Sequence, residues 1–254
     1  MEFNNLNIKI REIRAKSILS KSQVYEYALN PYIGCQHACV YCYAQFMKRF
    51  TGHRERWGEF LDVKINAPEL LALEVKKKRM VRVWISGVCD PYQPAERKYR
   101  ITRRCLDILL EKGWPFTVQT KSALVLRDIE ILKRSRDAEV GFTITTGDEK
   151  IRRIFEPAAP PLSKRIEALA NLHSEGIRTF VMIAPILPGA EGLVSVLKGK
   201  VEYVILDRLN YHYADWVYKK YGMQWAMGDN FFTAKGEELR MAFEREGISC
   251  QIVF

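Results

Sequence analysis

Residues 30–44 read Asn30-Pro31-Tyr32-Ile33-Gly34-Cys35-Gln36-His37-Ala38-Cys39-Val40-Tyr41-Cys42-Tyr43-Ala44. This stretch holds three of the six cysteines of the chain, at the spacing Cys-x3-Cys-x2-Cys. Pro31 and Gly34 predict a turn at which the backbone can approach a ligand closely. Because a chain of 254 residues does not need disulfide bonds to stabilise its core, the crowded thiols predict a metal site.

Cysteine thiolates are typical ligands of iron–sulfur clusters and of zinc. A [4Fe–4S] cluster normally takes four ligands, so a loop that supplies only Cys35, Cys39 and Cys42 leaves one iron open. We predict these three as the metal ligands. Zinc is an alternative that would need a fourth ligand, such as His37 or His53, and a chance group of buried cysteines is another. Unless it binds metal, His37 is expected beside the ligands or on the surface.

An apolar, β-branched run followed by a helical pattern recurs along the chain. The runs cover residues 25–29, 81–88, 116–120, 140–145, 179–186 and 201–206. Near-continuous apolar runs are typical of strands buried on both faces of a parallel sheet. We therefore predict an α/β fold, an incomplete (β/α)6 TIM-like barrel, with its active site at the carboxyl ends of the strands.

Helical patterns separate and follow these runs. They cover residues 69–78, 102–112, 164–175, 215–221 and 235–246, and a short strand is expected at 248–254. No repeat, low-complexity tract or linker marks an internal boundary. We expect one domain over residues 1–254, with a core at about 22–210, a short amino-terminal extension and a helical carboxy-terminal extension over 211–254.

The charge balance is strongly basic. The formal net charge is +10, and Lys and Arg gather at residues 48–56, 76–79, 97–104 and 133–136. These groups favour either a polyanionic partner such as nucleic acid or ordinary solvated helix faces. No apolar run is long enough for a membrane helix, and residues 1–22 lack the apolar core of a signal peptide. We expect a cytoplasmic protein with no membrane partner.

The cysteine spacing, with Tyr41 before the third cysteine, resembles the signature of the radical S-adenosylmethionine (SAM) superfamily. Further stretches resemble its spore photoproduct lyase-like branch, whose members are often labelled DNA repair photolyases. These stretches are residues 14–20, 30–44, 63–66, 86–96, 120–122, 127–128, 156–157 with Arg165, and 185–189. The resemblance covers about residues 10–210 and is specific for the branch rather than for a substrate. Because only 34 residues precede Cys35, fewer than in the lyases, we do not assume their spore thymine dimer as the substrate.

The resemblance implies a [4Fe–4S] cluster and SAM as cofactors, and a reductant such as ferredoxin or flavodoxin. SAM would bind the open iron and be cleaved reductively to a 5′-deoxyadenosyl radical, which abstracts hydrogen from the substrate. Tyr41 and Tyr43 match paired tyrosines that the lyases assign to radical transfer, and Tyr41 is also expected to contact the cofactor. Cys89 lies near, but not at, the register of the hydrogen-donating cysteine of the lyases. The alternative for Cys89 is a small buried residue.

Other candidate cofactor contacts lie at predicted strand ends. Lys121 follows the third run, where the resemblance places a lysine that binds the cofactor, and its ammonium group could pair with the SAM carboxylate. Thr143 and Thr145 share one face of the fourth strand. They would bind the ribose hydroxyls of SAM, or they reflect β propensity alone.

Asp90 is expected to orient the SAM ammonium group, bind substrate or cap the next helix. Ile186 and Pro188, after the fifth run, are placed to pack on adenine. Glu156 and Arg165 are expected to form a supporting ion pair in the lower wall of the site.

A nucleic acid is the leading substrate class, because the basic charge and the family analogy agree. Its phosphates would cross the open side of the barrel near Lys48, Arg49 and Arg54, and its target base would have to be flipped out or already distorted. One alternative keeps the radical chemistry but acts on a peptide or a small metabolite. Another is a non-catalytic iron–sulfur or zinc protein that binds nucleic acid.

Overall fold

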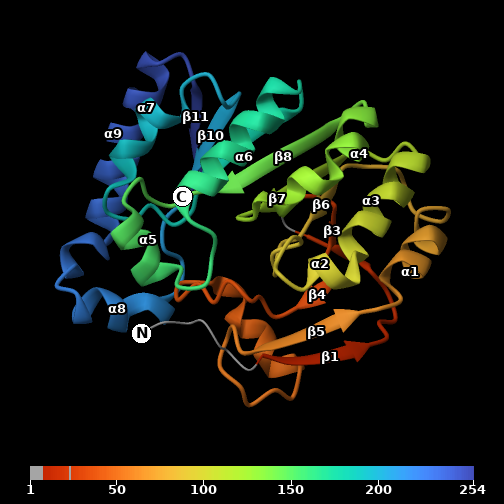
Figure 1. The fold of residues 1–254 in the computed structure, drawn as a ribbon. Helices are drawn as coiled ribbons and strands as arrows, with labels where there is room; N and C mark the ends of the chain where they lie inside the picture. The colour runs from red at the N-terminus through yellow and green to blue at the C-terminus, as the bar shows by residue number, and fades with distance from the viewer. Residues whose placement is uncertain (1–7, 23) are drawn as a thin grey trace.

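The computed structural model describes residues 8–22 and 24–254 (Figure 1). Residues 1–7 and residue 23 lie outside the described part. The prediction that residues 1–22 contain no signal peptide therefore falls partly on residues that the structure does not describe. The main sheet has eight strands in the order β11-β10-β9-β8-β7-β6-β3-β2. In chain order they are β2 (Leu19–Lys21), β3 (Tyr27–Leu29), β6 (Val83–Ile85), β7 (Phe116–Thr120), β8 (Ala138–Thr143), β9 (Arg178–Ile183), β10 (Tyr203–Leu206) and β11 (Ser249–Ile252).

The six predicted apolar runs form β3 and β6 to β10, and they are neighbours in the order in which they occur in the chain. All pairs from β3 to β11 are parallel, whereas β2 is antiparallel to β3. The predicted α/β class with a large parallel sheet is thus confirmed. The terminal strand was also predicted, but it joins this sheet as a further parallel strand. The edge strands β2 and β11 do not pair with each other in the part of the chain that is described.

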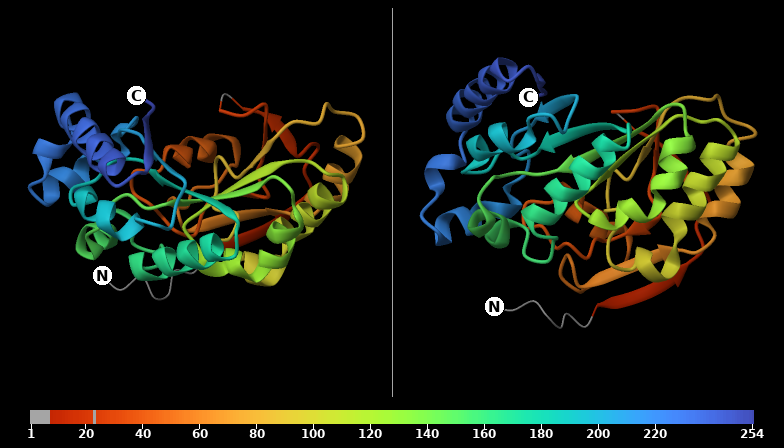
Figure 2. Two further views of the ribbon diagram at one scale, coloured as in Figure 1. Left: turned by 90° about the horizontal axis from the view of Figure 1, so that it is seen from above. Right: turned by 45° about the horizontal axis from the view of Figure 1, so that its top comes forward.

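Helices cover this sheet, and the five predicted helical segments are all present. The longer helices are α1 (Ala67–Glu74), α3 (Ile101–Glu111), α6 (Leu162–Ser174) and α9 (Asp229–Arg245). Shorter ones are α2 (Glu96–Tyr99), α4 (Ile129–Arg134), α5 (Glu149–Phe155), α7 (Leu193–Leu197) and α8 (Asp215–Lys220). α1 and α3 pack side by side, α6 packs on β8 and β9, and α9 packs on β11. Figure 2 shows α8 and α9, in blue, at the opposite end of the molecule from α1 and α3.

A second, smaller sheet was not predicted. It contains β1 (Lys9–Ile13), β5 (Phe60–Lys64) and β4 (Tyr32–Ile33), in the order β1-β5-β4. β1 has three exposed and two half-buried residues, and three of its five side chains are charged, so it lacks the continuous apolar run that predicts the other strands. A Cβ atom at Gly34, whose φ is +92°, would lie 2.5 Å from the carbonyl oxygen of Phe60. The turn glycine therefore allows the start of the cysteine loop to approach β5.

No helix in the part of the chain covered by the structure is long and apolar enough to cross a lipid bilayer.

Candidate active site

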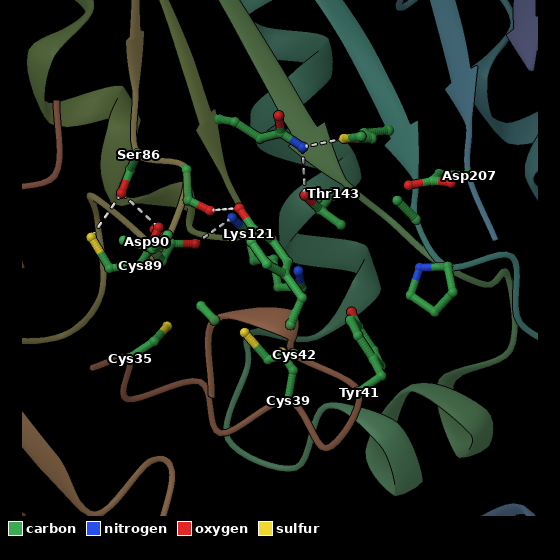
Figure 3. A pocket seen from close by; sticks show the side chains of 18 of the residues that line it. Cys35, Cys39, Tyr41, Cys42, Ser86, Cys89, Asp90, Lys121, Thr143 and Asp207 are labelled. Atoms are coloured by element: carbon green, nitrogen blue, oxygen red, sulfur yellow. Dashed lines mark hydrogen bonds between the residues drawn. The ribbon is translucent and has the colours of Figure 1, made fainter. Parts of the chain in front are cut away.

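A cavity of about 620 Å³ opens at the carboxyl ends of the parallel strands (Figure 3). Its walls come from the cysteine loop and from the segments that end or follow β6, β7, β8, β9 and β10. This is the edge of the sheet at which the sequence predicted an active site.

Cys35, Cys39 and Cys42 all line this cavity, and Figure 3 shows them on the loop that faces the strand ends. Cys35 and Cys39 are buried and Cys42 is half-buried. The amide of Val40 donates a hydrogen bond to the carbonyl oxygen of Phe155 (2.9 Å), which ties the loop to the end of α5. Beneath the loop, Cys39 and Phe155 belong to a separate apolar cluster that includes residues of α8. The three thiols are therefore held on a supported loop.

Burial has the largest effect on the pKa values of these three thiols. It raises the pKa of Cys39 to about 12, against the opposing positive charge of Lys121, and it also raises the pKa values of Cys35 and Cys42. At neutral pH the free loop therefore carries protonated thiols, and metal binding must release their protons.

The two histidines considered as zinc ligands are engaged elsewhere. His37 Nε2 lies 3.1 Å from Asp90 Oδ2, and the ring of His53 bonds Glu55 and Asp62 beside the small sheet. His37 is buried and lines the same cavity as the three thiols, so of its two expected positions the structure shows the one beside the ligands and not the one on the surface. Across residues 8–22 and 24–254, no three His, Cys, Asp or Glu side chains are grouped as a single metal ion would require. Three thiols without a protein side chain as fourth ligand fit a cluster that keeps one iron open.

The Asp90 carboxylate is fully occupied by hydrogen-bond partners. Its Oδ1 accepts from the Tyr92 amide (2.8 Å) and the Thr120 hydroxyl (2.7 Å). Its Oδ2 accepts from the Lys121 amide (2.7 Å) and faces His37. Burial alone would raise the pKa of Asp90, but His37 and the hydrogen bonds lower it to about 2. Asp90 therefore links the cysteine loop to β6 and β7 through three hydrogen bonds and the close contact with His37.

Glu156 is the centre of a second buried network. Its Oε2 lies 2.5 Å from Arg165 Nη2, and both side chains are fully buried, so the predicted ion pair is present. Oε1 accepts hydrogen bonds from the hydroxyls of Tyr41 and Thr145. Lys121 Nζ lies 3.9 Å from the same oxygen. Thr145 thus serves Glu156 and does not line the cavity, whereas Thr143 does.

Lys121 is the cation of this network that lines the cavity. Burial opposes the charged amine, but Cys39 and Glu156 outweigh it and raise the pKa of Lys121. Its ammonium group lies 5.7 Å from the centre of the Tyr41 ring, and the side chain lines the cavity. Its nearest carboxylate oxygen, Glu156 Oε1, is 3.9 Å away, and the Glu156 carboxylate is already paired with Arg165, so the half-buried ammonium group can bind an anionic ligand.

The titration of Glu156 predicts an acid-dependent loss of stability. Burial would raise its pKa, but Arg165 and Lys121 lower it to about 2, below the value of roughly 4.3 for an unfolded chain. A depressed folded-state pKa adds stability above the unfolded value and loses it as the pH falls toward the folded value. We expect the difference in free energy of unfolding between the wild type and Glu156→Gln to shrink by about 2–3 kcal/mol as the pH falls from 5 to 2.5.

Urea unfolding of both proteins across this pH range measures the effect. Glu237→Gln, at an exposed carboxylate on α9, is the matched control and should differ from the wild type by a constant amount. A gap between wild type and Glu156→Gln that does not change with pH would contradict the assignment.

Cys89 lines the cavity on the segment after β6. Its Sγ lies 2.8 Å from the hydroxyl oxygen of Ser86, whose φ of 88° is unusual for a residue with a side chain. Figure 3 shows both side chains beside Asp90. Burial raises the pKa of Cys89 to about 11, so this thiol keeps its hydrogen at neutral pH.

The paired tyrosines face different ways. Tyr41 is buried and its hydroxyl donates to Glu156, whereas Tyr43 is 39% exposed and its hydroxyl donates to the carbonyl oxygen of Gly87. Both line the cavity, Tyr41 in its wall and Tyr43 at its mouth.

The structure does not place Ile186 and Pro188 on the cavity wall. Ile186 is fully buried, and the cavity is lined instead by Ala184 and Pro185, directly after β9. The sequence analysis also missed Asp207, which lines the cavity directly after β10 (Figure 3). Its position at a strand end, shared with Lys121, was the signal that could have found it.

Comparisons with known proteins agree with this geometry. The family model described as the radical SAM superfamily matches residues 29–191. An uncharacterized protein of Methanocaldococcus jannaschii is 37% identical over 187 residues, which cover 72% of this chain and 70% of that protein.

Two solved structures share the fold. A spore photoproduct lyase complexed with dinucleoside spore photoproduct aligns with a TM-score of 0.70 and 15% identity, over 96% of this chain and 82% of that one. SuiB of Streptococcus suis, bound to its precursor peptide SuiA, aligns with a TM-score of 0.62 and 15% identity, over 89% of this chain and 48% of that one. At these identities the likeness concerns the fold alone.

Proposed function

This chain belongs to the radical SAM superfamily, and we propose that it abstracts hydrogen from a nucleic-acid substrate held at the mouth of the cavity. The cofactors of the family are a [4Fe–4S] cluster and SAM. The observation that carries the proposal is the convergence of three thiols and the Lys121 ammonium group on a single cavity at the strand ends. In this reading the main sheet is the incomplete (β/α)6 barrel of the superfamily, and the whole chain acts as one domain in the cytoplasm.

Cys35, Cys39 and Cys42 would hold the cluster through three of its irons. When bound, such a cluster cleaves SAM reductively to methionine and a 5′-deoxyadenosyl radical. The protein supports this chemistry by holding the thiols on a loop anchored to α5 and by surrounding them with buried walls.

The residues facing the thiols would bind SAM. Lys121 is placed to pair with its carboxylate, because the ammonium group is half-buried and its nearest carboxylate, Glu156, is already neutralised by Arg165. Thr143 is placed for the ribose, and Tyr41 packs beside Lys121. We assign the adenine contact to Pro185 rather than to Ile186 and Pro188.

Removing the charge of Lys121 tests this assignment. We expect Lys121→Met to weaken SAM binding to the cluster-loaded protein by about 10- to 100-fold, because a charge-assisted hydrogen bond contributes about 1.5–3 kcal/mol. Equilibrium dialysis with labelled SAM measures the affinity. Lys121→Arg should recover part of it, and Lys133→Met, at an exposed lysine paired with Glu175, should bind like the wild type. Equal SAM affinities of Lys121→Met and the wild type would contradict the assignment of Lys121 to the SAM carboxylate.

Hydrogen transfer to the substrate radical would involve three other residues that line the cavity. Cys89 carries a protonated thiol into the cavity, and a thiol is a good hydrogen donor to a carbon radical because its S–H bond is weak. Tyr43 and Tyr41 provide phenol groups on the cysteine-loop side. We propose that Cys89 would give its thiol hydrogen to the substrate radical and become a thiyl radical. The thiyl radical would take a phenol hydrogen from the tyrosine side, and the tyrosyl radical left there would take hydrogen from 5′-deoxyadenosine.

A reductant must deliver one electron to the cluster. A second hollow of about 340 Å³ reaches Cys39 and Val40 and is lined in part by Lys48, Arg56 and Trp216. Its basic rim suits an acidic electron carrier such as ferredoxin or flavodoxin.

The choice of nucleic acid rests on the basic charge of the chain and on analogy with the lyase bound to its dinucleoside. The peptide seen with SuiB makes a peptide the second candidate. The test is anaerobic incubation of the reconstituted protein with dithionite and SAM, which should release 5′-deoxyadenosine. Deuterated nucleic-acid or peptide extracts with unlabelled SAM then show which class passes deuterium to 5′-deoxyadenosine. Absence of 5′-deoxyadenosine under these conditions would overturn the function.

A further inference from the structure

Five aromatic rings form a continuous row across the mouth of the cavity. In spatial order they are Tyr213, Tyr211, Tyr43, Phe46 and Phe50. The first three separations between ring centroids are 5.7, 6.3 and 6.3 Å with nearly parallel rings, and the last is 6.4 Å with the rings edge to face. We call this set the aromatic row.

Two segments far apart in the sequence build the aromatic row. Tyr43, Phe46 and Phe50 lie on the short 3-10 helix Tyr43–Phe50 that follows the cysteine loop, and the other two rings follow β10. Tyr43 and Tyr211 also line the cavity, so the middle of the row lies at the site and both ends lead away from it.

The rings are too exposed to belong to the core. Phe50 is 71% exposed, Tyr211 is 44% exposed, and neither belongs to the buried apolar clusters. Single exposed aromatic residues are ordinary, but a contiguous run of them at a cavity mouth marks a binding surface.

Unpaired cations accompany the rings. The guanidinium of Arg49 lies 5.9 Å from the centre of Phe46 and 5.8 Å from that of Phe50. Neither Arg49 nor the exposed Arg54 forms an ion pair with any carboxylate in residues 8–22 and 24–254. Positive charge beside stacked rings complements a polyanion that also carries flat apolar groups.

The carboxylates near the row lie on its Tyr211–Tyr213 side. Asp229 is neutralised by Arg208, 2.9 Å away, whereas Asp215 lies 3.1 Å from His212, which balances its charge only when protonated. Positive charge is therefore gathered at the Phe46–Phe50 end of the aromatic row, around Arg49, and there favours an anionic partner.

We propose that the aromatic row binds a single-stranded segment of nucleic acid, with its bases stacked on the rings and its phosphates near Arg49 and Arg54. Bases in a duplex stack on one another and do not offer their faces to protein rings, whereas unpaired bases do. The row would lead such a strand to the cavity, where one base reaches the reacting centre. This inference rests on the proposed nucleic-acid function and deepens it by naming the strand form and its path.

Fluorescence anisotropy with a labelled 12-nucleotide single-stranded DNA tests the inference on the cluster-loaded protein. We expect Phe50→Ala to weaken binding by about 5- to 100-fold, because stacking contributes about 1–3 kcal/mol per base. Phe50→Trp should restore it. Tyr221→Ala, at an exposed tyrosine outside the row, should bind like the wild type. Arg49→Gln should lower the slope of log affinity against log salt by about 0.7, the loss of one phosphate contact.

Equal binding by Phe50→Ala and Tyr221→Ala, or equal affinity of the wild type for the same sequence as a duplex, would overturn the inference. Its failure is distinguishable from failure of the proposed function. Wild-type protein that releases 5′-deoxyadenosine but does not bind the oligonucleotide keeps the radical chemistry and loses the strand path. Wild-type protein that binds the oligonucleotide through the aromatic row but releases no 5′-deoxyadenosine keeps the strand path and loses the radical chemistry.

Discussion

Cys42→Ala is expected to lose the [4Fe–4S] cluster and to reduce the release of 5′-deoxyadenosine by more than about 100-fold, since even partners of metal ligands change affinity by 10- to 100-fold. The substitution leaves two thiols on the loop, and two thiols hold a cubane too weakly. The loop cannot rearrange to bring in another cysteine, because the amide of Val40 is bonded to Phe155 and the loop packs on an apolar cluster.

Iron content and the electron paramagnetic resonance signal of the reduced cluster measure the first effect, and chromatography of 5′-deoxyadenosine measures the second. Cys250→Ala is the matched control, because Cys250 lies on β11 and does not line the cavity. It should keep both properties. A Cys42→Ala protein with full iron content and turnover would show that the ligands lie elsewhere.

Arg165→Met is expected to have the largest effect on stability. It leaves the Glu156 carboxylate buried beside Lys121 alone, whose ammonium group is 3.9 Å away instead of 2.5 Å. Removal of one partner of a buried ion pair costs about 3–5 kcal/mol. We expect a loss near the lower end of this range in the free energy of unfolding at pH 7, because Lys121 still compensates part of the charge.

Urea unfolding of the single and double variants measures this loss. Arg165→Met with Glu156→Gln should be less destabilised than the sum of the two single changes, because the double variant buries no uncompensated carboxylate. Arg240→Met removes an exposed arginine from its pairs with Glu237 and Glu244, and should cost no more than about 1 kcal/mol. A similar loss in Arg165→Met and Arg240→Met would contradict the role assigned to the buried pair.

Removal of the Arg165 side chain should also disturb the cysteine loop. Glu156 accepts the hydrogen bond of Tyr41, which lies between the ligands Cys39 and Cys42. The same carboxylate that stabilises the fold therefore orients the loop, and stability and the metal site are coupled through one buried charge.

The strands of the main sheet could be predicted because their signal is local. Burial on both faces of a sheet favours a continuous apolar run, and segments such as β9 and β10 show it without knowledge of their neighbours. β1 could not be found in the same way. β1 is an edge strand that pairs only with β5, so its charged side chains can remain partly in solvent. One of them, Arg11, forms an ion pair with the buried Asp62 of β5.

Side-chain roles at strand ends were less predictable. Lys121 and Thr143 line the cavity as expected, but Asp90 is occupied by four partners and Thr145 serves Glu156. Alternation along a strand indicates which face a residue shares, whereas hydrogen-bond partners come from other segments. Sequence spacing carries no information about those partners.

What this sequence determined alone is the order of its parallel strands and the trio of thiols, since apolar periodicity and cysteine spacing are properties of short segments. The tertiary structure decided which charges are buried together and which rings form the aromatic row. Glu156 meets Arg165, and Tyr43 meets Tyr211, only because the chain returns to the same edge of the sheet. Contacts between distant segments depend on three-dimensional packing, and that packing is where the specificity of this site arises.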